Sequence, residues 1–310
     1  MMILSICTAL VGGIAQPTAP ATDSSQISVA EEACVGRVYP ERADDFAWEN
    51  DIVAFRAYGP ATRAKGEKAY GYDIFFKHPG KGAVLDILYA NSTDPRRKEK
   101  IDSVRINHPE QYQSYKESFN LHRDHGYGYD CYAVGPTLGA GVAARLQGDS
   151  IVFPWCYERA EILEKEPDRI TFRLDFPPAD SIVEHRLISL GRGSHLNNTN
   201  VWYESVDDRE MADSIDIVVG FPLRDESPVY CDNNILAYAD PTQGDGNGKA
   251  LLGIILDRTA TTLRLDSHIL LSFKINPKEP FSYRWGYAWS KADIASLAEW
   301  IEYLKSVKNE

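Results

Sequence analysis

The sequence predicts an all-β fold, a large antiparallel sandwich with one helix at its C-terminal end. Runs in which apolar and polar residues alternate recur between residues 51 and 289, and turn-forming clusters such as PPAD and NPKEP separate them. Few stretches show helical periodicity, and many strands without intervening helices pack as sheet on sheet. The 310 residues carry no internal repeat and no change in composition, which indicates one domain.

The N-terminal residues have the pattern of an export signal. Residues 1–15 form an uncharged apolar run too short to span a membrane, although the usual positive charge at its start is missing. We predict a signal peptide over residues 1–19, a flexible linker over residues 20–30 and a β-sandwich domain over residues 31–310. The protein is therefore expected to be exported, to the periplasm or outside the cell.

The first expected strand, residues 51–60, places Val53 and Phe55 on one face and Arg56 on the other, where the charge needs a partner. The other expected strands are residues 83–90, 141–146, 151–153, 160–164, 170–176, 181–190, 201–206, 214–219, 235–238, 251–256, 269–275 and 283–289.

Only two helices are expected. Residues 109–118 begin with a proline, which suits the first turn of a helix, and continue with good helix formers. Residues 290–307 begin with Ser290 and Asp293, which resemble a capping box, and an apolar stripe follows. We predict that this stripe packs the helix on the sandwich; it comprises Ile294, Leu297, Ala298, Ile301 and Leu304.

Charge and missing motifs exclude several functions. The formal net charge of -12 argues against a nucleic-acid partner or an anionic membrane surface, and no segment is predicted to insert into a membrane. Neither GxSxG nor GxxxxGK[ST] occurs, which excludes the enzyme classes that depend on them. GDGNG, residues 244–248, lacks the later acidic ligand of a calcium loop and is interpreted as a hairpin turn. We expect no metal and no cofactor, and the oligomeric state stays open.

Four cysteines follow the expected signal peptide: Cys34, Cys131, Cys156 and Cys231. None has a CxxC spacing, and in an oxidising compartment they allow up to two disulfides. We predict a Cys131–Cys156 pair, because both residues flank candidate site segments.

The segment HRDHGYGYDCYAVG, residues 122–135, has titratable side chains at most positions and three glycines, a mixture that no packing pattern requires. It predicts a loop for acid–base chemistry. One alternative is a polar surface loop with its tyrosines in the core, and another is a divalent metal site at His122, Asp124 and His125. The acid–base set comprises His122 or His125 with Tyr127, Tyr129 or Tyr132, steadied by Arg123 and Asp130.

Aromatic residues form a second pattern. Tyr283, Trp285, Tyr287 and Trp289 share one face of an expected strand, with Arg284 on the other face. Such a face suits the apolar side of a sugar ring, although core filling explains most aromatic residues. We expect this wall to meet the 122–132 segment in one cleft.

Four segments carry a resemblance to a known family: residues 41–60, 122–135, 230–253 and 281–293. They resemble a secreted bacterial β-sandwich family of formerly unknown function that occurs among polysaccharide-degrading genes. The resemblance implies a supersandwich fold akin to galactose mutarotases. It also implies a hydro-lyase activity that dehydrates a terminal uronic acid of an oligosaccharide to a 4,5-unsaturated uronate.

That chemistry needs a base for the C5 proton, an acid for the C4 oxygen and a cation for the carboxylate. The alternatives are a non-catalytic carbohydrate-binding module and a mutarotase-like epimerase. The predicted catalytic residues are His122, His125, Tyr127, Tyr129 and Lys274. The predicted substrate-binding residues are Arg56, Arg123, Trp155, Tyr283, Arg284, Trp285 and Trp289.

Overall fold

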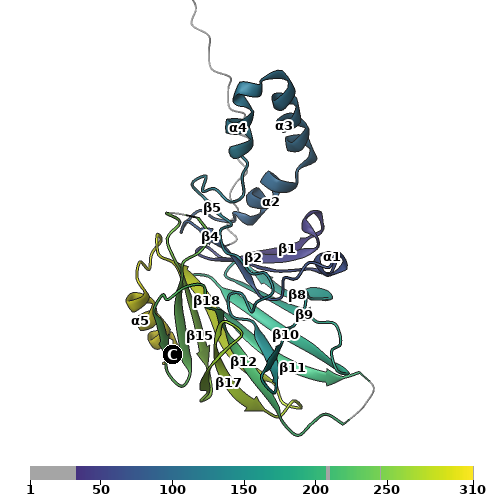
Figure 1. Cartoon of the computed structure of the whole chain (residues 1–310), viewed down its shortest axis with the longest axis vertical. Coiled ribbons are helices and arrows are strands. Elements are labelled where there is room, and N and C mark those ends of the chain that lie inside the picture. The colour runs from purple at the N-terminus through teal and green to yellow at the C-terminus, as the bar shows by residue number, and fades with distance from the viewer. Residues whose placement is uncertain (1–32, 207–209, 245, 310) are drawn as a thin grey trace, which may run out of the picture.

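The computed structural model describes residues 33–206, 210–244 and 246–309, and the expected signal peptide and linker lie outside them. The described residues form three antiparallel sheets (Figure 1). The predicted all-β sandwich is confirmed. The largest sheet contains, in spatial order, β13 (Val229–Cys231), β14 (Ile235–Asp240), β15 (Ala250–Leu256), β18 (Phe281–Trp289), β11 (Leu196–Ser205), β10 (Ile182–Gly191), β9 (Arg169–Asp175) and β8 (Arg159–Glu166).

Two five-stranded sheets accompany the large one. The first contains β16 (Thr261–Leu265), β17 (His268–Ile275), β12 (Ile215–Pro222), β6 (Ala143–Gln147) and β7 (Ser150–Val152). The second contains β1 (Val35–Tyr39), β2 (Asp45–Glu49), β3 (Ala54–Ala57), β4 (Asp73–Lys77) and β5 (Gly128–Tyr129). A 3-10 turn, η1 (Pro40–Arg42), joins β1 to β2, and α1 (Pro60–Ala64) follows β3.

Aromatic side chains join the sheets in one core. The Trp285 ring of β18 stacks on Tyr72 at 4.1 Å between ring centroids and meets the edge of Trp48 of β2 at 6.2 Å. Tyr283, Trp285, Tyr287 and Trp289 are all at most 3% exposed. The expected open aromatic wall is therefore wrong, because these rings fill the space between the sheets.

Three helices between β4 and β5 extend the molecule beyond the ends of these strands (Figure 1): α2 (Leu85–Thr93), α3 (Pro95–Asn107) and α4 (Pro109–Glu117). The helix expected at residues 109–118 is confirmed as α4. The strand expected at residues 83–90 is wrong. Its buried residues Leu85, Leu88 and Tyr89 are three and four apart, which is the spacing of a helix. The long helix α3 was not predicted, because it buries none of its side chains and shows no apolar period.

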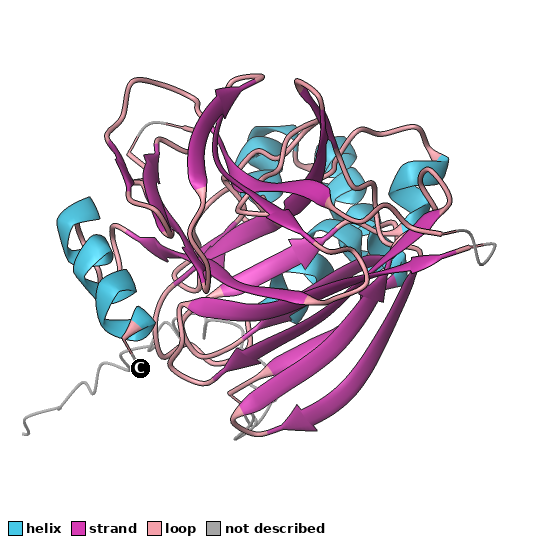
Figure 2. Ribbon diagram, turned by 90° about the horizontal axis from the view of Figure 1, so that it is seen from below, coloured by secondary structure: helices cyan, strands magenta, loops and turns pink. Residues whose placement is uncertain are grey.

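The C-terminal helix α5 (Leu297–Lys308) lies on the outside of the large sheet (Figure 2), where it packs on β14 and β15. The helix begins later than predicted, because the capping box is Ser296 with Glu299 and not Ser290 with Asp293. Leu304 of the predicted stripe is fully buried in the contact, and so is Trp300, which the stripe did not include, whereas Ala298 of the stripe is exposed. No helix in the described ranges is both long and apolar enough to cross a membrane.

The predicted Cys131–Cys156 disulfide is wrong in this structure, where all four cysteines of the described chain are free. The two thiols have different neighbours. Cys156 Sγ donates to the Ala69 carbonyl over 3.7 Å, whereas Cys131 lies beside Tyr129 and Thr242.

Candidate functional site

A buried arginine ties three strands to the segment after β5. Arg56 of β3 is 3% exposed. Its Nε donates to Asp73 Oδ2 over 3.1 Å, and its Nη2 donates to Asp130 Oδ2 over 3.3 Å. The Tyr58 hydroxyl donates to the same Asp73 oxygen over 2.6 Å, and Asp45 Oδ2 lies 3.6 Å from Arg56 Nη1. Arg56, expected to bind substrate, is therefore enclosed by carboxylates of the protein itself.

Two carboxyl groups of this cluster, Asp45 and Asp130, have raised pKa values, because burial disfavours their charged forms. Burial raises the pKa of Asp45 to about 6, against the attraction of Arg56. Burial also raises the pKa of Asp130 to about 6, while the charges of Arg56 and His122 lower it. The cluster thus holds two carboxyl groups whose charged forms are disfavoured by burial and stabilised by Arg56.

His122 is fixed by the backbone of Asp130. Its Nδ1 lies 2.7 Å from the Asp130 carbonyl oxygen, which can only accept a hydrogen bond. In the neutral imidazole Nδ1 therefore carries the proton, and Nε2 has the free lone pair. Nε2 has no hydrogen-bond partner within the described part of the chain, and the residue is exposed. This is the arrangement that a general base needs.

His122 lines a pocket of about 470 Å³ between the sheet β1–β5 and the helices α2–α4. Two cationic side chains line the same pocket, Arg42 from η1 and Lys116 from α4, and within the described residues neither forms an ion pair. The carboxylate that lines it, Glu117, is bound by Arg123 over 2.5 Å. One pocket is therefore lined by a candidate base and by two cations that form no ion pair within the described residues. The other lining residues are Asn91, Ser92, Ile101, Phe119, Asn120 and Leu121.

The backbone after Arg42 is strained and tightly held. Ala43 and Asp44 have φ values of 56° and 60°, in the left-handed region that residues other than glycine rarely adopt. The Tyr157 hydroxyl donates to the Asp44 carbonyl, and Gly59 packs directly against that carbonyl. Strain at two consecutive residues beside a pocket is typical of functional sites. Sequence patterns gave no sign of Arg42, which lies in a short turn.

Tyr127 does not line the pocket itself, but its hydroxyl contacts Asn91, which does. Its hydroxyl accepts a hydrogen bond from Asn91 Nδ2 over 2.7 Å, so its own proton stays available. His125 Nε2 lies 3.2 Å from the Asn120 carbonyl, and its ring lies 6.2 Å from the Tyr127 ring. The structure thus places His125 beside Tyr127, while His122 makes a separate contact with Asp130.

Other predicted residues lie elsewhere. The Tyr129 ring contacts the Trp289 ring at 5.7 Å, so the loop and strand β18 do meet, but both side chains are buried in the core. Lys274 of β17 is exposed and pairs with Asp216 over 2.9 Å. Trp155 lines a separate pocket beside Tyr203.

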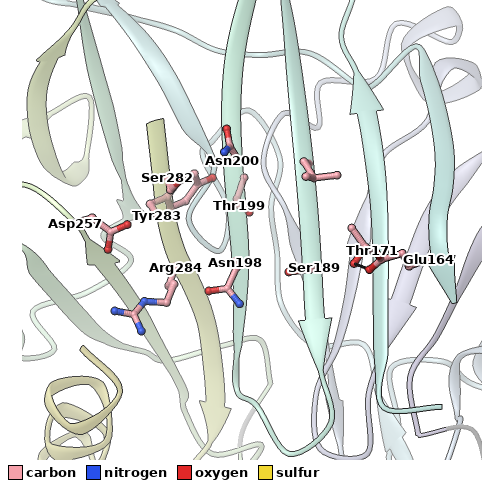
Figure 3. A pocket seen from close by; sticks show the side chains of 11 residues that line it. Glu164, Thr171, Ser189, Asn198, Thr199, Asn200, Asp257, Ser282, Tyr283 and Arg284 are labelled. Atoms are coloured by element: carbon pink, nitrogen blue, oxygen red, sulfur yellow. Dashed lines mark hydrogen bonds between the residues drawn. The ribbon is translucent and has the colours of Figure 1, made fainter. Parts of the chain in front are cut away.

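Arg284 lines another concavity, of about 490 Å³, on the outer face of the large sheet (Figure 3). Asn198 and Asn200 of β11 and Ser282 of β18 share this face with it. Arg284 Nη1 donates to the Val307 carbonyl of α5 over 2.7 Å. This residue is therefore anchored away from His122.

A histidine outside the predicted set also has a carboxylate partner. His78 Nε2 lies 2.7 Å from Asp124 Oδ2, and the His78 ring lies 4.9 Å from the Trp289 ring. The three side chains of the alternative metal site, His122, Asp124 and His125, therefore make separate contacts. No cluster of three or more metal-ligand side chains occurs in the ranges that the structure describes.

A protein of Formosa agariphila, "Uncharacterized protein P7", is 25% identical to the chain over 294 residues. The alignment covers 88% of this chain and 66% of that protein, so the chain spans slightly less than two thirds of its relative.

Solved structures overlap only in part. Heparinase III shares 11% identity at a TM-score of 0.31, over 49% of this chain and 24% of that one. The GH36 α-galactosidase AgaA of Geobacillus stearothermophilus shares 10% identity at a TM-score of 0.35, over 79% of this chain and 40% of that one. A mutant of the heparan sulfate lyase HepC of Pedobacter heparinus shares 8% identity at a TM-score of 0.34, over 82% of this chain and 36% of that one. Overlaps of this size assign no activity to the chain.

A family match covers nearly the whole chain, from residue 14 to residue 310. It includes all three sheets, the helices α2–α4 and the pocket at His122. The chain therefore belongs to the family described as "Domain of unknown function (DUF4861)".

Proposed function

We propose that the protein is a hydro-lyase that removes water from the terminal uronic acid of an oligosaccharide, giving a 4,5-unsaturated uronate. One observation carries the proposal: His122, with its Nε2 free, lines the same pocket as the unpaired cations Arg42 and Lys116. A base beside a cationic carboxylate site is what removal of a proton next to a carboxylate requires.

In the proposed reaction Arg42 and Lys116 bind the uronate carboxylate and stabilise the negative charge that develops on it. His122 Nε2 takes the C5 proton, while the Asp130 carbonyl accepts from Nδ1–H and keeps the imidazole ring oriented. The electron pair of the C5–H bond forms the C4–C5 double bond. The C4–O bond breaks, and the hydroxyl leaves as water with a proton from Tyr127.

Tyr127 suits the acid role because its hydroxyl accepts from Asn91 and keeps its own proton free. The imidazolium then returns its proton through solvent to the Tyr127 phenolate, which restores both groups. Arg56 and Asp130 act as positioning residues, since they hold the carbonyl that orients His122.

Turnover of uronate-ended oligosaccharides tests the proposal. The product gains a double bond conjugated with the carboxylate, which absorbs in the ultraviolet, and loses the mass of one water. We expect His122→Gln and Tyr127→Phe to lower kcat by about 10²- to 10⁴-fold. Arg42→Gln should mainly raise KM.

A matched control is His108→Gln, because His108 is 60% exposed and does not line the pocket. It should keep wild-type turnover. Folding of every variant is checked by denaturation. Wild-type rates in both His122→Gln and Tyr127→Phe would contradict the mechanism. A protein that binds these oligosaccharides without changing their mass or absorbance would instead be a binding module.

A further inference from the structure

A second pocket, of about 140 Å³, lies between the ends of β7, β10 and β11. It shares no lining residue with the pocket at His122. Phe153, Trp155 and Pro177 provide apolar walls, and Arg145, Glu184 and Tyr203 provide polar groups. Its volume is less than a third of that of the pocket at His122, so it suits a small ring better than a chain of rings.

The pocket contains a buried polar group without a partner. Tyr203 is 4% exposed, and its hydroxyl has no hydrogen-bond partner within the residues that the structure describes. Buried hydroxyls nearly always form a hydrogen bond with protein, water or ligand, and a buried hydroxyl without one costs stability. A small polar molecule that enters the pocket would supply the partner that the Tyr203 hydroxyl lacks.

Trp155 presents an aromatic face at the same pocket. Its side chain is 39% exposed, which is unusual for so large an apolar group. The Tyr70 ring meets it edge-on at 5.9 Å and stacks on Phe153 at 5.3 Å. The indole is therefore held in one orientation while part of its surface stays open, which suits the apolar face of a sugar ring.

The charges around the pocket are already matched. Arg145 Nη2 donates to Asp180 over 2.9 Å, and Glu184 accepts from Arg186 Nε over 2.5 Å. A negatively charged ligand would be repelled by Glu184, and a positively charged ligand would be repelled by Arg145. A hydroxyl both donates and accepts, so it satisfies either group as well as Tyr203.

We propose that this pocket binds a single neutral pyranose ring, with the ring stacked on Trp155 and its hydroxyls bonded to Tyr203, Arg145 and Glu184. It is a binding site without chemistry of its own. Its place apart from His122 would let the protein hold a neutral sugar of a polysaccharide independently of the reacting end.

The test uses the full chain and the methyl glycosides of glucose, galactose, xylose and rhamnose. Binding is measured by saturation-transfer NMR and by calorimetry. We expect at least one glycoside to bind with a millimolar Kd. Trp155→Ala should weaken it at least about tenfold, and Tyr203→Phe about 3- to 10-fold, since one net hydrogen bond is removed.

Two controls separate this site from others. Trp202→Ala removes a half-buried tryptophan that does not line the pocket and should leave the Kd unchanged. His122→Gln should also bind normally, so loss of turnover and loss of binding are distinguishable. The inference is overturned if no glycoside binds, if Trp155→Ala binds like the wild type, or if methyl glucuronide binds more tightly than every neutral glycoside.

Discussion

Replacing Gly59 with alanine tests whether the strained backbone beside Arg42 is held by its neighbours. Gly59 has φ −93° and ψ 176°, an extended conformation that any residue adopts, so only the added methyl group matters. An ideal Cβ at this position would lie 1.9 Å from the Asp44 carbonyl oxygen, whereas real Cβ contacts essentially never fall below 3.0 Å. The carbonyl must therefore move by about 1 Å. Tyr157 opposes that movement, because its hydroxyl donates to the same oxygen.

Overpacking of this kind costs about 1–3 kcal/mol of unfolding free energy. If Arg42 moves with Asp44, turnover should fall as well, by up to about 10²-fold for a displacement near 1 Å. Both effects are measured on one preparation, by denaturant unfolding and by uronate turnover. Gly191→Ala is the control, since the nearest atom to its new Cβ would be the Asp168 carbonyl oxygen at 3.9 Å. Equal unfolding midpoints for both variants would refute the reasoning.

Three further predictions concern stability and reactivity. Burial raises the pKa of Asp45 from 3.8 to about 6, so its protonated form favours folding at low pH and that contribution is lost as the pH rises through 6. The free energy of unfolding of Asp45→Asn, relative to that of the wild type, should therefore increase by up to about 3 kcal/mol between pH 4 and pH 7. Stability curves that stay parallel over this range would contradict this. Leu304→Ala should cost about 2–5 kcal/mol, because the side chain is fully buried under α5, while Glu302→Ala, 73% exposed, should cost little in the same denaturation assay. In native protein a thiol reagent should label Cys231 before the three buried cysteines of the described chain, and peptide mapping that shows equal rates would be inconsistent with the structure.

Most strands from β6 onwards were predicted, because alternation of side chains is a local property that each strand carries by itself, but β13 and β16 were not. The same alternation could not show what covers each face. In β18 the residues Tyr283 to Trp289 read equally well as a ligand wall or as core, and the register of β18 beside β11 and β15 puts them inside. That outcome depends on the other sheets, which the strand does not encode.

The candidate site was half predictable. His122 and Tyr127 stand in a segment whose composition no packing pattern explains. Arg42 and Lys116 come from a short turn and from a polar helix, and only the folded chain brings them to one pocket with His122. Such meetings depend on contacts between residues distant in sequence, so local patterns do not show them.

The two sides of the pocket at His122 differ in how deeply their side chains are buried. One side is the cluster around Arg56, and the other is formed by α3 and α4. Arg56, Asp73 and Asp130 beneath the histidine are at most 5% exposed, whereas α3 and α4 bury none of their side chains. Opening these two helices would thus expose little apolar surface, and local unfolding should be far less costly there than in the sheets. Such local unfolding would leave Asp130, whose carbonyl orients His122, in the buried core. A ligand that enters between these helices and the sheet would therefore leave the core undisturbed.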